Sequence, residues 1–445
     1  MTTVMTRRGL MPLHDALLTL WVVLLGADRV NLLDGLTFVI TPFLALTPLV
    51  IASEWVRRQA RRRPIEAPAK AVAYVALCAA LIGVVLASVM ISPDPATSAS
   101  RATLLAVQVC GTILVVILAA DRPDLTGFLG RAAVYGVVLF VAANVLTLAT
   151  WLRLAPENWQ LGTVTVDLVS FPFTGLLPRL SGTSGDPNRG GWLLLFLGNL
   201  VAVGERRPRL QRVTMITVAV LIVATLSRSA VFGAFTALVA GSLDHRRPFR
   251  VGVRSLTVFA ACTAVGCTAL LVSPPVRLPN LTRWAPLTER LTINEGSGKD
   301  HIILLQRGME EATSSVPHVL LGIGYGSSYL VTQDVLPGNR HGNFHSFYVT
   351  MFGESGLFAL LIALVIVGWP LVGGGPYRPL IAGAAVFNLF YQVSSEPSFW
   401  LALALGWVFA RVTLTAGRAL NPAATPASAQ SANRGGDANV EHVVA

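Results

Sequence analysis

Residues 71–91 read AVAYVALCAALIGVVLASVMI, a continuous apolar run with no polar face. A helix needs about 20 such residues to cross the roughly 30 Å hydrocarbon core of a bilayer. A soluble helix of this length would carry polar residues along one side. Residues 102–120 and 132–152 repeat the apolar pattern. These stretches therefore predict helices that cross a membrane.

The composition of the whole chain also indicates a membrane as its solvent. Of 445 residues, 53% are hydrophobic and 13% are charged, whereas about 25% are charged in an average soluble domain. Hydrophobicity and loop charge predict an all-α fold, a polytopic membrane bundle of about 12 transmembrane helices with a partly helical extracytoplasmic loop domain. The expected spans lie near residues 14–27, 36–54, 71–91, 102–120, 132–152, 190–204, 213–227, 229–243, 255–273, 344–369, 379–394 and 398–413.

The arginines between these spans predict the topology. The net charge of +11 does not indicate a nucleic-acid partner, because most arginines lie in short connections between spans. Basic loops face the cytoplasm, which places the cluster at residues 57–63 inside. The clusters at 206–212 and 246–254 recur two spans apart, as alternating loops require. Both termini are therefore expected inside.

Two loops are expected outside, and both exceed the usual connection length, which is typical of functional or disordered segments. The chain then divides into a first bundle at residues 1–273 that includes the outer loop 153–189, a large outer loop at 274–345, the last spans at 346–413, and a disordered cytoplasmic tail at 414–445.

The large outer loop is expected to be partly folded, because residues 300–313 have an apolar helical face. Residues 321–326 read LGIGYG, but no βαβ unit surrounds them. We interpret them as a turn and not as a nucleotide-binding loop. The region 344–369 is long enough to contain a broken helix around residues 353–356.

Arg228 breaks the positive-inside pattern, because it lies in a tight turn between two apolar helices on the outer side. A lone cation near hydrocarbon is costly unless it is paired or reaches water. One interpretation is an arginine that extends to the lipid headgroups. The other is a fixed cation that faces an anionic ligand, since guanidinium groups suit phosphate oxygens.

Residues 179–191 read RLSGTSGDPNRGG and precede the sixth expected span. The glycines and the Asp-Pro-Asn sequence specify turns, so a loop that simply leads into a helix explains them. An anion at this point would, however, meet Arg179, Arg189 and the free N–H groups of a helix N-terminus.

Residues 340–356 read RHGNFHSFYVTMFGESG. A histidine at a helix start is often a cap or an interface residue, but here His341 and His345 lie near Arg340 at the expected mouth of the membrane. Gly342 interrupts the helical spacing that a zinc site would need, so no metal site is predicted.

These pieces, in this order, resemble the O-antigen ligase and polymerase family of bacterial envelope glycosyltransferases, over nearly the whole chain. Two features depart from the family pattern. The usual His-Asn is His345-Ser346, and the arginine expected to open the outer-loop helix is replaced by the Lys-Asp-His sequence of residues 299–301. The residues that carry the resemblance are Arg179, Gly182, Asp186, Pro187, Asn188, Ser227, Arg228, Gly322, Gly324, His345, Glu354 and Gly356.

The resemblance implies transfer of a glycan from an undecaprenyl-diphosphate carrier to an acceptor hydroxyl, on the outer face of the bacterial cytoplasmic (inner) membrane, with no metal or other cofactor. Arg179 and Arg228 would hold the diphosphate, and His345 would orient or deprotonate the hydroxyl. The partners would be the lipid-linked donor, a lipid or glycan acceptor, and membrane lipids. Further substrate contacts are expected from Asn188, Arg189, Lys299, Arg307, Arg340, His341 and Glu396.

Two alternatives stay open at this point. Ligases and polymerases share this chemistry and differ in the acceptor, and the motifs do not separate them. A transporter or flippase of lipid-linked glycans or of another anionic substrate would also use outward arginines. The two halves of the sequence have no evident internal symmetry or paired broken helices, and the outer loop with its histidines favours an enzyme.

Overall fold

The computed structural model describes residues 12–33, 39–61, 69–167, 179–243, 297–333, 335 and 342–411, with the backbone only at 297–299. The chain separates into two units, Met1–Val412 and Thr413–Ala445, and all described residues belong to the first. The predicted span at 255–273 and the predicted tail at 414–445 lie outside the described residues.

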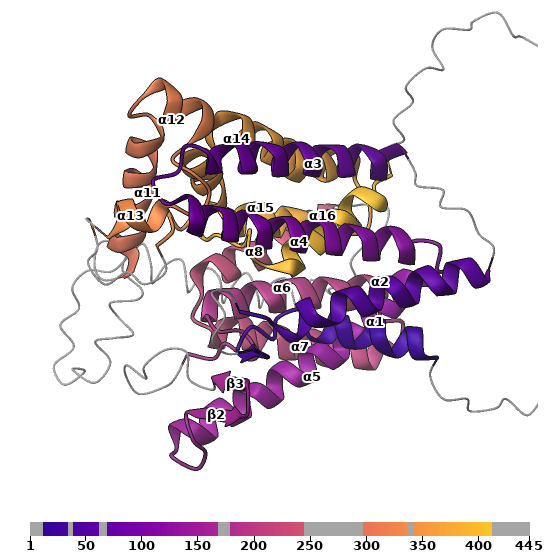
Figure 1. Ribbon diagram of the computed structural model, residues 1–445. Helices are drawn as coiled ribbons and strands as arrows, with labels where there is room; N and C mark the ends of the chain where they lie inside the picture. The colour runs from indigo at the N-terminus through magenta and orange to yellow at the C-terminus, as the bar shows by residue number, and fades with distance from the viewer. Residues whose placement is uncertain are drawn as a thin grey trace, which may run out of the picture. The chain divides into compact units, whose positions relative to one another are not determined.

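Every other predicted span overlaps a helix (Figure 1). Pro occupies the first turn of several of these helices, where its missing N–H costs nothing. The helices are α1 (Leu13–Val23), α2 (Pro42–Ala60), α3 (Ala69–Val89), α4 (Pro95–Ala119), α5 (Leu125–Trp151), α6 (Pro187–Gly204), α7 (Pro208–Ala224), α8 (Arg228–Leu243), α14 (Phe347–Gly373), α15 (Arg378–Phe390) and α16 (Pro397–Val408).

Among the described residues, four helices are long and apolar enough to cross a membrane by length and composition, namely α3, α4, α5 and α14. The helices α1, α8, α15 and α16 are apolar but shorter. Helix α6 lies inside the bundle, with Trp192, Leu194 and Phe196 fully buried. The protein is therefore a helical membrane protein, and twelve spans and their sidedness stay predictions.

Small residues let the helices approach closely, as is common in membrane bundles. A Cβ on Gly383 of α15 would lie 2.7 Å from the carbonyl oxygen of Gly233 on α8. A Cβ on Gly204, at the end of α6, would lie 2.0 Å from the carbonyl oxygen of Thr126 on α5. These two contacts bring α8 close to α15 and α5 close to α6. Helix α6 also packs against α8 and α15, so it lies between the two pairs.

A small antiparallel sheet departs from the all-α expectation. Its strands are β1 (Val30–Asn31), β2 (Asn158–Leu161) and β3 (Val164–Asp167), in the order β1-β3-β2. Gly162, with φ 61°, stands in the two-residue turn between β2 and β3. The predicted outer loop 153–189 therefore begins with a hairpin, and Gly162 flanked by Trp159 and Val164 was a sequence signal for it.

The predicted large loop contains α11 (Ser297–Ala312), α12 (Val316–Leu321) and α13 (Ser328–Thr332). The expectation that this region is partly helical is confirmed. Helix α11 packs on the start of α14, because a Cβ on Gly308 would lie 2.6 Å from Val349 and 2.7 Å from Phe344.

Helix α14 is broken at Gly356, as predicted, where φ is 80° and ψ is −177°. The LGIGYG segment is a turn, also as predicted, and it docks on this break. Ile323 N–H donates to the Gly353 carbonyl at 2.9 Å, and Gly326 N–H donates to the Glu354 carboxylate at 2.9 Å. The glycine turn thus satisfies carbonyl groups near the break, which would otherwise lack partners in an apolar environment.

Candidate functional site

Charged and aromatic side chains from six separate segments of the chain meet at one end of the bundle. We call this cluster the histidine end. Helix α1 stops just before it, α6, α8 and α16 begin at it, and α15 ends at it. Its members are Asp28, Asp186, Arg189, Arg228, His301, His345, Tyr391 and Glu396.

Arg189 is held between two carboxylates. Its Nη1 lies 3.3 Å from Asp28 Oδ2, and its Nε lies 3.1 Å from Glu396 Oε1. Burial raises the pKa of Asp28, and it raises the pKa of Glu396 to about 7, although Arg189 works in the opposite direction at both. Glu396, expected from the sequence as a substrate contact, therefore forms an ion pair with Arg189.

Asp186 connects this ion cluster to the rings. Its side chain caps α6 by accepting the N–H groups of Asn188, at 2.7 Å, and Arg189, at 3.2 Å. Tyr391 also forms a side-chain hydrogen bond with Asp186. The Asp-Pro-Asn sequence therefore builds the helix N-terminus that the loop interpretation expected, and Asn188 takes part through its backbone.

Arg29 stabilises the loop that carries Asp186. Arg29 was not identified from the sequence. Its guanidinium is 8% exposed and donates to the Ser184 carbonyl at 2.7 Å and to Thr147 at 3.1 Å, and it also contacts Ser181. An adjacent Asp28-Arg29 pair directly after an apolar span was the available signal, because charged residues there need partners.

Arg179 contacts the backbone of the turn that precedes Arg228. Its Nε donates to the Thr225 carbonyl at 3.1 Å, and its Nη2 lies 3.3 Å from the Leu226 carbonyl. Leu226 has a left-handed φ of 54°, which costs energy for a non-glycine residue. Arg179 therefore stabilises the strained turn that leads into α8.

Two imidazole rings form the centre of the histidine end. The centroids of His301 and His345 are 4.2 Å apart with an interplanar angle of 37°, and Tyr391 lies 5.9 Å from His345. His345 has a φ of 53°, and its N–H donates to Asn343 Oδ1 at 2.9 Å. The N-cap of α14 is Ser346, so His345 is not the cap residue.

His301 is partly buried and lies near a cation. Its ring donates a hydrogen bond to the Phe390 carbonyl, and its pKa is lowered by burial first and by the charge of Arg228 second. His301 was noted in the sequence only as part of a departure from the family pattern. Its place on α11 follows from spacing, because His301, Leu304 and Gly308 share the helix face that packs on α14.

Arg228 differs from the other arginines of this end. It is the first residue of α8, half-buried, and none of the carboxylates in the described part of the chain forms an ion pair with it. Arg189 has two carboxylates and Arg179 has two carbonyls. Within the described part of the chain, Arg228 thus differs from Arg189 in having no carboxylate partner.

The remaining predicted contacts do not join the cluster or are not described. Arg307 lies 3.5 Å from Glu310 and 3.6 Å from Glu311 on its own helix. The side chain of Lys299 and all of Arg340 and His341 lie outside the described residues. Within the described chain, no group of three or more His, Cys, Asp or Glu side chains is arranged to hold a metal ion.

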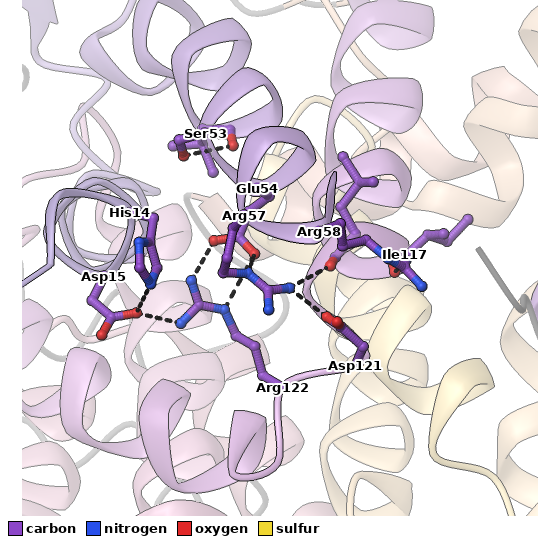
Figure 2. Close-up of polar contacts among 11 residues, drawn as sticks. His14, Asp15, Ser53, Glu54, Arg57, Arg58, Ile117, Asp121 and Arg122 are labelled. Atoms are coloured by element: carbon purple, nitrogen blue, oxygen red, sulfur yellow. Dashed lines mark hydrogen bonds and ion pairs between the residues drawn. The ribbon is translucent and has the colours of Figure 1, made fainter. Parts of the chain in front are cut away.

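A second charged cluster lies at the start of α1, near the end of α2 and just after α4, and we call it the arginine end (Figure 2). Glu54 is fully buried and contacts both Arg57, at 2.8 Å, and Arg122. Arg57 also contacts Asp121 and donates to the Leu118 carbonyl at 2.9 Å. The arginine end consists of Asp15, Glu54, Arg57, Arg58, Asp121 and Arg122.

Comparison of the chain with protein-family models and with curated proteins finds no match. The resemblance to the O-antigen ligase and polymerase family therefore rests on the motif residues of the sequence alone.

Proposed function

We propose that this chain transfers a glycan from an undecaprenyl-diphosphate carrier to an acceptor hydroxyl, at the histidine end. The observation that carries the proposal is the position of two imidazole rings beside Arg228. An imidazole can accept a proton near neutral pH, and a guanidinium binds phosphate oxygens in a fork. A proton acceptor and an anion binder are the two groups that this reaction needs.

In the proposed reaction, the acceptor oxygen forms a bond to the anomeric carbon of the donor, and the bond from that carbon to the diphosphate oxygen breaks. The hydroxyl proton passes to His345, and the electrons of the broken bond leave with the diphosphate. Arg228 would neutralise the charge that develops on this leaving group. His345 is favoured as the base because its strained backbone is held by Asn343, and such strain is common at functional sites.

The supporting roles of the other predicted residues follow from their contacts. Arg189 already balances Asp28 and Glu396, so we assign it to positioning Asp186 and Tyr391. Arg179 would act through the turn before Arg228. The apolar helices α3, α4, α5 and α14 supply a membrane setting that suits a polyprenyl chain.

The proposal is tested with purified protein and a polyprenyl-diphosphate oligosaccharide, by measuring the release of polyprenyl diphosphate. His345→Ala is expected to lower turnover by about 10²–10⁴, the usual loss for a general base, while donor binding stays close to wild type. Arg228→Ala is expected to weaken donor binding as well. Arg228→Lys keeps the charge without the fork and should fall between wild type and Arg228→Ala.

Arg206→Ala is the matched control, because its side chain is 76% exposed and it pairs with Asp124, at the end of α6 opposite the histidine end. Its turnover should stay close to the wild-type value, because substitutions of exposed residues usually have small effects. Turnover by His345→Ala above half of the wild-type value would contradict the catalytic assignment. Movement of intact donor across vesicles without release of polyprenyl diphosphate would instead support the transporter alternative. The acceptor that restores turnover, a lipid or a second carrier-linked glycan, would decide between ligase and polymerase.

A further inference from the structure

The contact between His301 and His345 has a specific geometry. Two imidazoles that share an in-line N–H···N bond need their ring centres farther apart than 4.2 Å, since a hydrogen bond of about 2.8–3.0 Å must fit between the ring edges. The rings of His301 and His345 therefore lie face against face, with the 37° tilt between them. They do not pass a proton directly from one ring to the other.

His301 is held in this position from two sides. Its ring N–H donates to the Phe390 carbonyl at the end of α15, which fixes which nitrogen carries the proton. The helix that carries it is fixed by the close approach of Gly308 to Phe344 and Val349. The fixed ring of His301 thus restricts the position of the His345 side chain.

If both imidazoles carried a proton, their positive charges would repel each other across the 4.2 Å between the ring centres. When two titrating groups interact strongly, the protons bind in two steps that belong to the pair and not to one residue. The surroundings hold one cation and two carboxylates close to the pair, and a tyrosine next to His345. These groups are Arg228 on α8, Asp186 before α6, Asp300 on α11, and Tyr391 after α15.

We propose that His301 is a positioning residue for His345, and that the two imidazoles form a coupled pair that holds at most one proton near neutral pH. In its neutral form, His301 presents a ring face to His345 and lets that residue accept the proton of the acceptor hydroxyl. Once His301 is protonated, a second proton on His345 is opposed by charge repulsion. The positioning role rests on the proposed function, whereas the coupling of the pair does not.

The lowered pKa of His301 agrees with a neutral ring at physiological pH, because burial and Arg228 both disfavour its charged form. His301 belongs to the Lys-Asp-His sequence of residues 299–301, which departs from the family pattern. The paired imidazoles are therefore not part of that pattern.

The coupling is tested by following the histidine ring carbons by NMR in the full-length protein in detergent. Wild type is compared with His301→Phe and with His345→Phe, each of which leaves one titrating ring. In wild type, the second proton of the pair should bind at least about one pH unit below the midpoint that either ring shows alone. Equal midpoints in wild type and in the single variants would overturn the proposal.

His301→Gln gives a second neutral variant that keeps an N–H donor for the Phe390 carbonyl, in case His301→Phe does not fold. Because these titrations need no substrate, they stand or fall separately from the transfer reaction. Absence of transfer with intact coupling would remove the proposed function and leave the coupled pair.

The positioning role is tested by turnover. His301→Phe keeps a ring face and should retain most of the wild-type turnover, whereas His301→Ala removes the ring beside His345. Since a misplacement of about 1 Å can cost about 10²-fold, His301→Ala should lower kcat by up to that factor with little change in KM for the donor. Wild-type kcat in His301→Ala would contradict the role. Loss in His301→Phe as large as in His345→Ala would make His301 itself the base.

Discussion

The histidine end and the arginine end are both charged clusters at helix ends, but they match their charges differently. At the arginine end, the carboxylates of Asp15, Glu54 and Asp121 each contact an arginine. At the histidine end, Arg189 is shared by Asp28 and Glu396, while Arg228 has no carboxylate among the described residues. Every carboxylate of the first cluster thus contacts an arginine, whereas the second cluster contains an arginine with no carboxylate partner among the described residues.

The comparison therefore distinguishes charged residues that hold helices together from charged residues that belong to the proposed site. A buried ion pair is costly to form and very costly to break, so the ion pairs of Glu54 with Arg57 and Arg122 hold helix α2 and the segment after α4 in place. An unmatched guanidinium beside two imidazoles gains most when an anion binds. The predictions below test whether the two ends differ in side of the membrane, in stability and in response to pH.

The first prediction is all-or-none and concerns the side of the membrane. Cysteines are placed at Ala60, which is exposed after the arginine end, and at Gln333, which is exposed after α13. The four native cysteines are replaced by serine. A membrane-impermeant thiol reagent added to intact cells should label Gln333→Cys and not Ala60→Cys, because basic loops stay in the cytoplasm.

The opposite labelling pattern would invert the topology and remove the histidine end from the outer face. Labelling of both cysteines after the cells are opened is the control for reactivity. Equal labelling of both in intact cells would show that the two ends do not lie on opposite sides.

The second prediction concerns stability. Glu54→Ala should lower the free energy of unfolding by about 3–5 kcal/mol, since it leaves the buried guanidinium groups of Arg57 and Arg122 without this carboxylate. The measurement is denaturant unfolding in detergent. Asp124→Ala is the matched control, because Asp124 pairs with Arg206, whose side chain is 76% exposed. Exposed pairs contribute about 0–1 kcal/mol.

The folded fraction of Glu54→Ala should keep its specific turnover, because Glu54 belongs to the end opposite the proposed site. A loss of stability no greater than in Asp124→Ala would mean that the arginine end is not the structural cluster. Loss of turnover without loss of stability would contradict the division of roles between the two ends.

Much of the bundle could be predicted because a long apolar helix is a local signal. The break at Gly356 was also predictable, since Gly353 and Gly356 interrupt a region longer than a span needs. The hairpin at β2 and β3 was not expected, because its strands are only four residues each and lie inside a polar loop. Short strands depend on pairing more than on their own sequence.

The candidate site was predictable in its residues and less so in their roles. Arg228, His345 and Glu396 meet in one cluster, because each lies next to a helix end on the predicted outer side. The partners were not visible in the sequence. Arg189 and Asp28 are 161 residues apart, and the rings of His301 and His345 meet through the packing of α11 on α14. Such long-range partners follow from the fold and not from spacing along the chain.

The last prediction compares two buried glutamates, Glu396 at the histidine end and Glu205 at the end of α6. Burial raises the pKa of Glu396 to about 7, and Asp28 and Asp186 add to that increase against Arg189. Hydrogen bonds from Arg207 lower the pKa of Glu205, which binds this arginine through both oxygens at 3.0 Å. Glu396 therefore shares Arg189 with Asp28, whereas Glu205 pairs with Arg207 alone.

The signs of the two pH effects differ. The folded state keeps a proton on Glu396 between about pH 4.5 and 7, after the unfolded chain has lost it, so stability from this group falls as pH rises through that window. The slope is at most about 1.4 kcal/mol per pH unit. For Glu205, the stabilisation is present above its ordinary pKa and is lost only as pH falls below it, so nothing changes between about pH 5 and 8.

Glutamine at each position removes the titration and keeps the shape of the side chain. The stability of Glu396→Gln relative to wild type should therefore rise as pH increases from 5 to 7 and then level off, in unfolding curves measured in detergent. The relative stability of Glu205→Gln should be flat over the same range. A flat difference for Glu396→Gln would mean that Arg189 pairs with Glu396 as completely as Arg207 pairs with Glu205, and the contrast between a shared and an unshared arginine would not hold.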